Sequence, residues 1–361
     1  MAADRDASAL WGFWPDYSHD NPFQRMVYSA FPQGWIVRSA DIETAIAALA
    51  EAHYPVVFHL HWEDVIYREA ASIAVADTLV NVYLELLDAF IVAGGRFLWT
   101  VHNDAPHEPR FLEVDRRLRS QLAIRAHVVQ MHSQVAAACM APPLGIATSR
   151  VVVTPLGGFS GYYPDDIAKT QARRYFSIDA NAPVFVTVGS LRPYKGVEVL
   201  LSAFAIVHQA KPETRLIVAG RTGQQGADRF VWLRPGVLML PRYIDDATIQ
   251  YVMRAADFGV FSFHRIMVSS SVLLAETFGL PVIVPDLPTM REMVQPGQNG
   301  FLFTADDPAA LARTMLRTLD LSATERAALG QAALDDIRRR DWAEYTRALT
   351  EAVVDAPHVR I

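Results

Sequence analysis

The sequence predicts an α/β protein of two domains, each a parallel β-sheet with helices on its faces. Short β-branched and aromatic runs alternate with helix-length amphipathic segments through all 361 residues, which is typical of strands joined by crossover helices. At about 150 residues per domain, this length corresponds to two domains. Residues 155–164, PLGGFSGYYP, hold three glycines and two prolines and predict a loop near the domain boundary.

The expected strands are short apolar runs bounded by turn residues, and the expected helices are the longer amphipathic segments between them. In the first half, strands are expected at 56–60, 97–101, 126–131 and 150–154, and helices at 42–52, 70–92 and 111–124. In the second half, strands are expected at 184–188, 214–218, 237–240, 258–261 and 282–284, and helices at 196–209, 245–255, 271–278 and 308–320. Ligands bind outside the carboxyl ends of such strands, so we expect the loops of both domains to face a cleft.

The composition excludes several classes of protein. Hydrophobic residues make up 51% and charged residues 20% of the chain, which suits buried cores and is too apolar for a disordered chain. The 33 Lys+Arg and 39 Asp+Glu residues give a net charge of −6, so a general basic surface for nucleic acid is not expected. The single cysteine, Cys139, excludes an internal disulfide and a thiolate metal cluster, and favours the cytoplasm.

Neither export nor a membrane span is expected. The first ten residues carry three charges and lack the apolar core of a secretion signal. The most apolar stretch, residues 80–94, is broken by Glu85 and Asp88. The mean hydropathy of +0.13 is nevertheless high, which leaves docking on a membrane surface open.

A basic loop follows the strand expected at 184–188. It reads GSLRPYKG from Gly189 to Gly196 and precedes an expected helix. Arg192 offers a planar fork and Lys195 a mobile point charge, so together they can hold one anionic group. The alternative is a solvated basic turn on the surface.

A second anion site is predicted where Ser269, Ser270 and Ser271 lead into an apolar helix. The first turn of a helix has unpaired N–H groups, which together with the hydroxyls could bind a diphosphate. Glu276 lies about two turns further on, where a carboxylate needs a partner such as a pair of ribose hydroxyls. The alternative is an ordinary helix cap with Glu276 in a surface salt bridge.

Histidines follow two strands expected in the first half. His59 and His61 of HLHWE share one face of a strand, and TVHNDAPHE runs from a strand end into a loop at 100–108. Metal binding is a weak interpretation, because the pair has no evident third ligand. A polar rim of acid–base groups, formed by His102, Asp104 and Glu108, fits the pattern better. The alternative is that these are ordinary core or rim histidines.

Four ordered segments of the second half resemble the donor-binding domain of retaining GT-B glycosyltransferases, the glycosyltransferase family 4 group. They are VTVGSLRPYKGVEVLLSAF, LIVAGR, YIDDATIQYVMRAADFGVF and SSSVLLAETFGLPVIVPDLPTMREMVQPGQNGFLF. The resemblance implies a GT-B fold, with two Rossmann-like doubly wound domains facing a cleft. It also implies that Arg192 and Lys195 bind the donor diphosphate and stabilise the leaving group.

The same resemblance implies a set of donor-binding residues. They are Gly189, Ser190, Arg192, Lys195, Arg221, Tyr243, Ile244, Ser269, Ser270, Ser271 and Glu276. The family has two glutamates, with seven residues between them, of which Glu276 matches the second, on the nucleotide ribose. The first position is Val268 here, so the donor-sugar contact and the stereochemistry stay open.

The first half resembles bacterial glycosyltransferases that build exopolysaccharide units on a lipid carrier. The residues that carry this likeness are Asn21-Pro22-Phe23-Gln24 with Tyr28, HLHWE and TVHNDAPHE. The resemblance implies acceptor binding by Asn21, His59, His61, Trp62 and His107. It places His102 beside the donor sugar. If the enzyme inverts configuration, a catalytic base is required, and the candidates are His102, Asp104 and Glu108.

The resemblance also extends to the end of the chain, where DWAEY and the helix after it match a segment that crosses back onto the first domain. The expected domains are therefore residues 1–160 with the tail 342–361, which bind acceptor, and 161–341, which bind the nucleotide-sugar donor. We expect a metal-independent hexosyltransferase without a cofactor, on the inner face of the membrane or in the cytoplasm, acting on a glycan or lipid-linked acceptor. The alternatives are a catalytically degenerate GT-B subunit and a GT-B sugar-nucleotide epimerase, which would need no acceptor.

Overall fold

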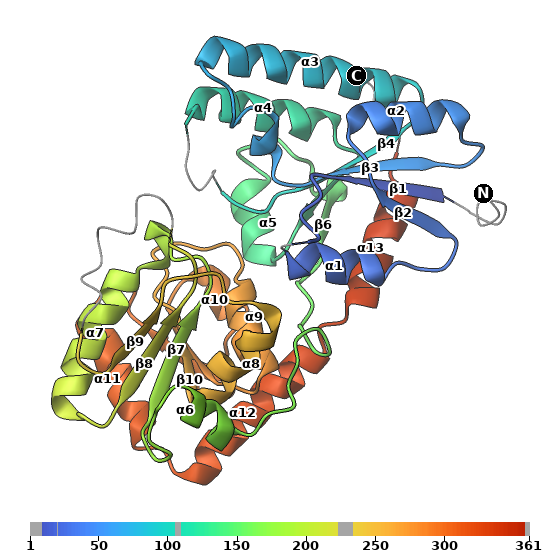
Figure 1. The fold of residues 1–361 in the computed structure, drawn as a ribbon. Helices are drawn as coiled ribbons and strands as arrows, with labels where there is room; N and C mark the ends of the chain where they lie inside the picture. Colours follow the sequence, from blue (N-terminus) through green and yellow to red (C-terminus); the bar gives the residue numbers. More distant parts are fainter. Residues whose placement is uncertain (1–8, 20, 105–109, 223–233, 358–361) are drawn as a thin grey trace. The chain divides into compact units, whose positions relative to one another are not determined.

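The computed structural model describes residues 9–19, 21–104, 110–222 and 234–357 (Figure 1). The chain forms two compact units. Unit 1 is residues 1–156 with 341–361, and unit 2 is residues 157–340. The divisions fall at 156/157 and 340/341, where the sequence suggested 160/161 and 341/342.

Unit 1 is a six-stranded sheet in the order β2-β1-β3-β4-β5-β6, with every described pairing parallel. The strands are β1 (Ala9–Trp14), β2 (Trp35–Ser39), β3 (Val56–Leu60), β4 (Arg96–Thr100), β5 (Val128–Met131) and β6 (Val151–Val153). Its helices are α1 (Pro22–Ser29), α2 (Ile42–Glu51), α3 (Ile73–Val92), α4 (Leu112–Arg125), α5 (Gln134–Met140) and α13 (Trp342–Asp355), with short 3₁₀ turns at Glu63–Ile66 and Thr148–Arg150.

The core of unit 1 lies between the central strands and α3. Phe58, Phe97 and Trp99 are fully buried, and Val80 and Leu87 of α3 pack on them. Each such side chain contributes about 1.5–3 kcal/mol through removal from water. The C-terminal α13 belongs to the same unit: its Thr346 hydroxyl donates to the carbonyl of Ala30 at 2.7 Å, just after α1.

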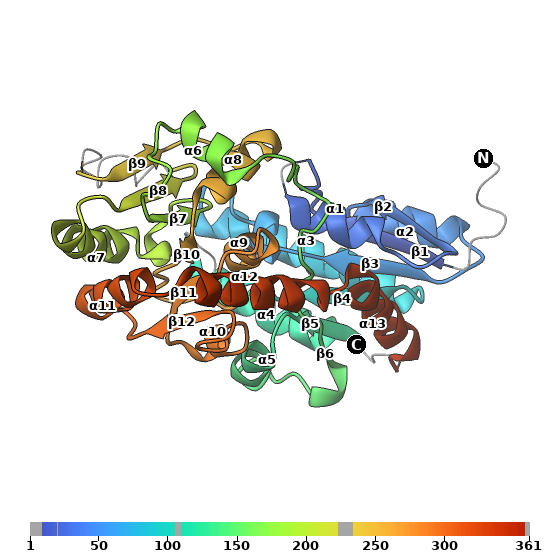
Figure 2. The same ribbon diagram turned by 90° about the horizontal axis from the view of Figure 1, so that it is seen from below.

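Unit 2 repeats this plan with the order β12-β11-β10-β7-β8-β9, again all parallel. Its strands are β7 (Val184–Val188), β8 (Arg215–Ala219), β9 (Val237–Leu240), β10 (Phe258–Val260), β11 (Val282–Pro285) and β12 (Gly300–Phe303). Its helices are α6 (Lys169–Tyr175), α7 (Val197–Ala210), α8 (Asp246–Ala255), α9 (Ser270–Thr277), α10 (Pro288–Arg291), α11 (Pro308–Leu319) and α12 (Ala323–Arg338), with a 3₁₀ turn at Pro193–Lys195. Helices α7 and α11 lie side by side (Figure 2).

Each sheet has one point at which the strand order reverses. In unit 1 it lies between β1 and β3, and in unit 2 between β7 and β10. The connections leaving these two strands diverge, so a crevice forms at their carboxyl ends, where ligands of doubly wound sheets bind. The loops carrying HLHWE and GSLRPYKG leave β3 and β7 at these positions.

The predicted α/β class is confirmed, and nearly all predicted elements lie within a few residues of the observed ones. Strands β1, β2 and β12, the 16-residue helix α12 and several short helices were not predicted. Strand β1 (ALWGFW) carries a glycine and two tryptophans in six residues, and α1 and α6 are eight and seven residues long. Segments this short show too few repeats for a period to be recognised.

The glycine at the end of the basic loop provides a test of the packing at the unit 2 crevice. Gly196 has φ +59°, and a Cβ on it would lie 2.0 Å from the carbonyl oxygen of Ser262 in the loop after β10. Gly161 has φ +77° with no heavy atom within 4 Å of such a Cβ. We expect Gly161→Ala to lower the free energy of unfolding by about 1 kcal/mol, from backbone strain alone. We expect Gly196→Ala to lower it by more than about 3 kcal/mol, and urea unfolding measures both values. Equal losses would contradict this packing.

Candidate functional site

Close backbone packing shapes the crevice of unit 2. Gly220 has φ +148°, and a Cβ there would lie 1.9 Å from the carbonyl oxygen of Gly189, so only glycine fits between the ends of β7 and β8. The Ser262 hydroxyl, after β10, donates to the carbonyl of Gly196 at 2.7 Å. The loops that follow β7, β8 and β10 are therefore held together at the point where the strand order reverses.

Lys195 lies inside this arrangement. Its Nζ donates to the Ser271 hydroxyl of α9 at 3.1 Å and lies 5.1 Å from the ring centre of Phe263. A Cβ on Gly189 would lie 2.8 Å from Ser271 Oγ and 3.2 Å from Lys195 Nζ, so the bare backbone of Gly189 leaves room beside both groups. The structure thus brings together Gly189, Lys195 and Ser271 from three elements.

Burial and the neighbouring Arg192 set the charge state of Lys195. Desolvation, and after it the like charge of Arg192, lowers the pKa of Lys195 to about 8. The half-buried Arg192 lies in the same turn. Two neighbouring cations that are partly removed from water repel each other, and a bound anion would offset this repulsion. The crevice is therefore suited to bind an anion.

Helix α9 begins beside Lys195. Ser269 caps it by accepting a hydrogen bond from the Val272 N–H at 3.2 Å, and Ser270 is exposed. The free N–H groups of the first turn and the helix dipole favour negative charge here. Ser269 and Ser271 are 3% and 7% exposed, so Ser270 is the one of the three serines that is exposed, and Ser271 takes part through its contact with Lys195.

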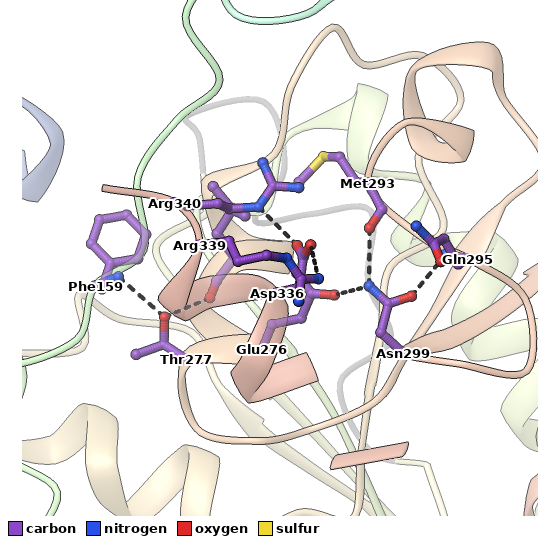
Figure 3. Close-up of polar contacts among 10 residues, drawn as sticks. Phe159, Glu276, Thr277, Met293, Gln295, Asn299, Asp336, Arg339 and Arg340 are labelled. Atoms are coloured by element: carbon purple, nitrogen blue, oxygen red, sulfur yellow. Dashed lines mark hydrogen bonds and ion pairs between the residues drawn. The ribbon is translucent and has the colours of Figure 1, made fainter. Parts of the chain in front are cut away.

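The Glu276 side chain does not point toward Lys195 and Ser271. The side chain is fully buried and accepts a hydrogen bond from Asn299 Nδ2 at 2.8 Å, on the side of α9 that packs against α12 (Figure 3). Ser271 and Glu276 are five residues apart, so at 100° per residue their side chains point about 140° apart. In this structure the carboxylate faces the interior of unit 2, and the expected ribose contact of Glu276 stays a prediction.

The surroundings of Glu276 disfavour its charge. Its Oε2 has no hydrogen-bond partner among the described residues. Desolvation, and after it the charge of Asp336 on α12, raises the pKa of Glu276 to about 8, although Arg340 and the Asn299 hydrogen bond oppose the rise. Asp336 in turn pairs with Arg339 at 3.1 Å and Arg340 at 2.8 Å. Glu276 is thus a buried, largely protonated acid near neutral pH.

The other expected donor residues lie at the ends of β7, β8 and β9. Arg221 places its guanidinium 5.4 Å from the ring centre of Tyr243, and both residues are exposed. Ser190 is exposed, whereas the side chain of Ile244 is 8% exposed and packs inward. Arg221, Tyr243 and Ser190 are thus open to a ligand, and Ile244 offers only its backbone.

In unit 1 the expected acceptor residues split into buried and half-buried sets. His59 and His61 are fully buried, so their side chains are not exposed to solvent here, and the acceptor contact expected of them stays a prediction. His102 is half-buried and stacks on Trp62 with ring centres 4.3 Å apart. Asn21 caps α1 by accepting from the Phe23 N–H at 3.0 Å. Asp104 is half-buried, and His107 and Glu108 lie outside the described residues.

Three further polar residues join the histidines: Tyr28, which the sequence suggested only as part of the family likeness, and His132 and Gln130, which were not predicted. Tyr28 of α1 lies within hydrogen-bond distance of both His59 and His61, and His132 lies beside His102. Gln130 of β5 contacts His132 in turn. His132 follows β5 as His61 follows β3 and His102 follows β4, and this repeated position is a signal that could have identified it.

Burial keeps these histidines uncharged. Desolvation lowers the pKa of His59 and His61 well below the usual value, and the charge of neighbouring histidines adds to the effect. Desolvation lowers the pKa of His132 to about 4, against an opposing contact with the backbone of Thr154. Within the described residues, no three His, Cys, Asp or Glu side chains are grouped so that they could hold a metal ion.

The crevice of unit 2 lies in a segment with a known family. Residues 182–320 match the family model described as glycosyl transferases group 1. The matched segment includes all six strands of unit 2. It contains the basic loop, the serine-capped helix and the buried Glu276. No helix in the described part of the chain is both long and apolar enough to cross a membrane.

Relatives of the group 1 segment are glycosyltransferases by name. The chain is 28% identical over 255 residues to a D-inositol 3-phosphate glycosyltransferase of Corynebacterium efficiens, which covers 68% of this chain and 60% of the relative. It is 25% identical over 332 residues to a GDP-mannose:glycolipid 4-beta-D-mannosyltransferase of Xanthomonas campestris, and this match covers 90% of this chain and 85% of the relative. The chain spans about half of the length of the curated relatives it matches first, with 46% to 60% covered.

Solved structures share the fold. The crystal structure of Anabaena Alr3699/HepE in complex with UDP matches with a TM-score of 0.72 and 17% identity, over 96% of this chain and 99% of that one. Such neighbours, together with two parallel six-stranded sheets, give the chain the GT-B fold with two Rossmann-like units.

The buried Glu276 makes the stability of the protein depend on pH. An unfolded glutamate has a pKa of about 4.3, and in the folded protein the value is about 8. Between these values the folded state holds a proton that the unfolded state has lost, so stability falls by up to about 1.4 kcal/mol per pH unit as pH rises. We expect Glu276→Gln to reduce this slope in urea unfolding between pH 5 and 9, and so to stabilise the protein at pH 9. The exposed control Glu213→Gln should keep the wild-type slope, and an unchanged slope in Glu276→Gln would contradict the assignment.

Proposed function

We propose that the chain is a glycosyltransferase that moves a sugar from a nucleotide-diphosphate donor to a glycan or lipid-linked acceptor. The observation that carries the proposal is the placement of Lys195 against Ser271 and Gly189, at the strand-order reversal of the group 1 unit. The similar proteins support a nucleotide-sugar donor, since HepE was crystallised with UDP and UDP-glucose and the Xanthomonas relative is named for GDP-mannose. We expect a UDP- or GDP-sugar for this chain as well.

In the proposed reaction, unit 2 stabilises the leaving group. Negative charge grows on the nucleotide diphosphate as the bond from the sugar to the phosphate oxygen breaks. Arg192, Lys195 and the N-terminus of α9 are the groups positioned to balance it, which is the role a divalent cation would otherwise have. Because these protein groups can balance the charge of the leaving group, we propose that catalysis needs neither a metal nor another cofactor.

Unit 1 is proposed to hold the acceptor. Its strand-order reversal between β1 and β3 presents Trp62 and His102, half-buried side chains that a sugar can contact. If the reaction inverts configuration, an uncharged His102 or the nearby Asp104 would take the proton of the acceptor hydroxyl. If it retains configuration, the leaving phosphate can take that proton on the same face.

The exopolysaccharide role and a position on the inner face of the membrane are also proposals. Their support is the word glycolipid in the name of the Xanthomonas relative and the outer face of α3. In this 20-residue helix Val75, Leu79 and Val82 are 44%, 42% and 50% exposed and share one face, and Glu85 is exposed one turn after Val82. Arg117 of the adjoining α4 contacts Asp77 of α3 at 2.9 Å and balances its charge beside this face. We propose that the face docks on a lipid bilayer through its apolar side chains.

Substitutions at the basic loop test the proposed transfer. A thermal-shift screen with UDP-, GDP-, ADP- and TDP-sugars first identifies the donor. We then expect Lys195→Ala and Arg192→Ala each to lower the transfer rate by about 10²-fold or more, while the exposed control Lys211→Ala retains it. Unchanged transfer in both loop variants would overturn the assignment, and conversion of donor in the absence of acceptor would favour the epimerase.

The lowered pKa of Lys195 adds a pH dependence to donor binding. The ammonium is present below about pH 8 and is lost above it, so affinity for the anionic donor should fall as pH rises from 7 to 9.5. Calorimetric titration with the identified donor should show this fall in the wild type and a much smaller one in Lys195→Ala. Equal falls in the two proteins would show that Lys195 does not meet the phosphates.

Vesicle flotation tests the α3 face. With vesicles of phosphatidylglycerol and phosphatidylethanolamine, the wild-type chain should float, and the double variant Leu79→Glu/Val82→Glu should stay in solution. Ile206→Glu on α7 is a matched control, since Ile206 is 44% exposed in unit 2. Flotation of the double variant at the wild-type level would rule this face out.

A further inference from the structure

His264 lies in the loop after β10 and has a carboxylate on each side of its ring. Its Nε2 lies 2.6 Å from Glu198 Oε1, and its Nδ1 pairs with Asp306 Oδ1. Glu198 belongs to the first turn of α7, and Asp306 directly precedes Asp307, the residue that caps α11. The half-buried ring thus joins three segments that are distant in the sequence.

These two contacts fix the charge of the ring. A carboxylate oxygen can only accept a hydrogen bond, so each ring nitrogen that faces one must carry a proton. A neutral imidazole has a single N–H, so the two hydrogen bonds together require an imidazolium. The dipoles of α7 and α11 favour negative charge at their first turns, which keeps Glu198 and Asp306 ionised.

The charged groups around the ring favour the same form. Desolvation disfavours the imidazolium, but the hydrogen bonds and charges of Asp306 and Glu198 outweigh it and raise the pKa of His264 above its usual value. The basic loop faces the residue with backbone: the His264 N–H donates to the carbonyl of Tyr194 at 2.9 Å, and a Cβ on Gly196 would lie 3.5 Å from His264 Cε1. As pH rises through this pKa, one ring proton and the hydrogen bond that it makes are lost.

The loop that carries His264 also forms part of the surroundings of Lys195. Phe263 is fully buried, and its ring centre lies 5.1 Å from Lys195 Nζ. The Ser262 hydroxyl donates to the carbonyl of Gly196, the last residue of the basic loop. His264 adds a side-chain contact to α7, the helix that directly follows the basic loop.

The geometry points to a positioning role for His264: as an imidazolium between Glu198 and Asp306, it ties the loop after β10 to α7 and to the turn before α11. This tie keeps Phe263 and the basic loop packed around Lys195. The tie follows from contacts within unit 2, whereas its consequence for donor binding rests on the proposed function, in which Lys195 holds the diphosphate.

The charge of the ring can be measured on the full chain without a ligand. Long-range ¹H–¹⁵N correlation spectra recorded from pH 5 to 9 should show a titration midpoint of His264 above about 6.5. The midpoint should fall in Glu198→Gln and in Asp306→Asn, which remove one carboxylate charge each. Asparagine also tolerates the left-handed backbone at position 306, where φ is +58°.

The exposed control Glu213→Gln should leave the midpoint of His264 where it is in the wild type. A wild-type midpoint below about 6.5, or an unchanged midpoint in both Glu198→Gln and Asp306→Asn, would overturn the imidazolium.

Amide hydrogen exchange of the full chain tests the positioning role. In peptides that cover residues 189–200 and 261–268, wild-type protection should fall between pH 6 and pH 9, after correction for the intrinsic exchange rate. His264→Gln keeps a polar side chain but cannot carry the charge. At pH 6 its protection should be about fivefold lower than in the wild type, which corresponds to about 1 kcal/mol.

The comparison at two pH values separates His264 from Lys195. Loss of charge from Lys195 lowers protection in both proteins, so the difference between them belongs to His264. The control His53→Gln, exposed in unit 1, should match the wild type. Equal protection of the wild type and His264→Gln at pH 6 would overturn the positioning role. Because both measurements use the protein without a ligand, failure here is distinct from failure of the proposed transfer.

Discussion

Burial of a parallel sheet on both faces is the constraint on which both units depend. A strand such as β3, β4 or β7 has helices on each side, so its side chains are removed from water in both directions. A polar side chain within such a strand must find a partner inside the protein or destabilise it by an unpaired group. Side chains that bind a ligand therefore lie at the carboxyl ends of the strands, and above all at the point where the strand order reverses.

The two units satisfy this constraint by different means. The strands of unit 2 are mostly apolar. At its crevice, Gly220 packs closely against the backbone of Gly189, and the loop after β7 supplies the cations. Unit 1 carries polar residues inside the strands themselves, His59 and Gln130 among them, and pairs them with each other. Burial lowers the pKa of Lys195 and of the histidines alike, but Lys195 stays mostly protonated near neutral pH whereas the histidines stay uncharged.

Much of the candidate site could be predicted because it lies close together in the sequence. GSLRPYKG directly follows an evident strand, and the serines directly precede an evident helix, so Lys195 and Ser271 needed only the general rule for parallel sheets. The parts that could not be predicted depend on partners distant in the chain. His132 joins His61 and His102 because β3, β4 and β5 are neighbours in one sheet, and Tyr28 joins His59 and His61 from the separate helix α1.

The amino-acid sequence by itself determined the alternation of strands and helices, and with it the α/β class and the loops that carry the charged and serine side chains. Only the tertiary structure decided which way each polar side chain points. Glu276 illustrates the difference: its distance from the serines suggested a common site, yet the packing of α9 on α12 turns its carboxylate into the interior, against Asn299 and near Asp336. Sequence spacing sets the angle between two side chains on a helix, but which of them faces a crevice depends on what the helix packs against.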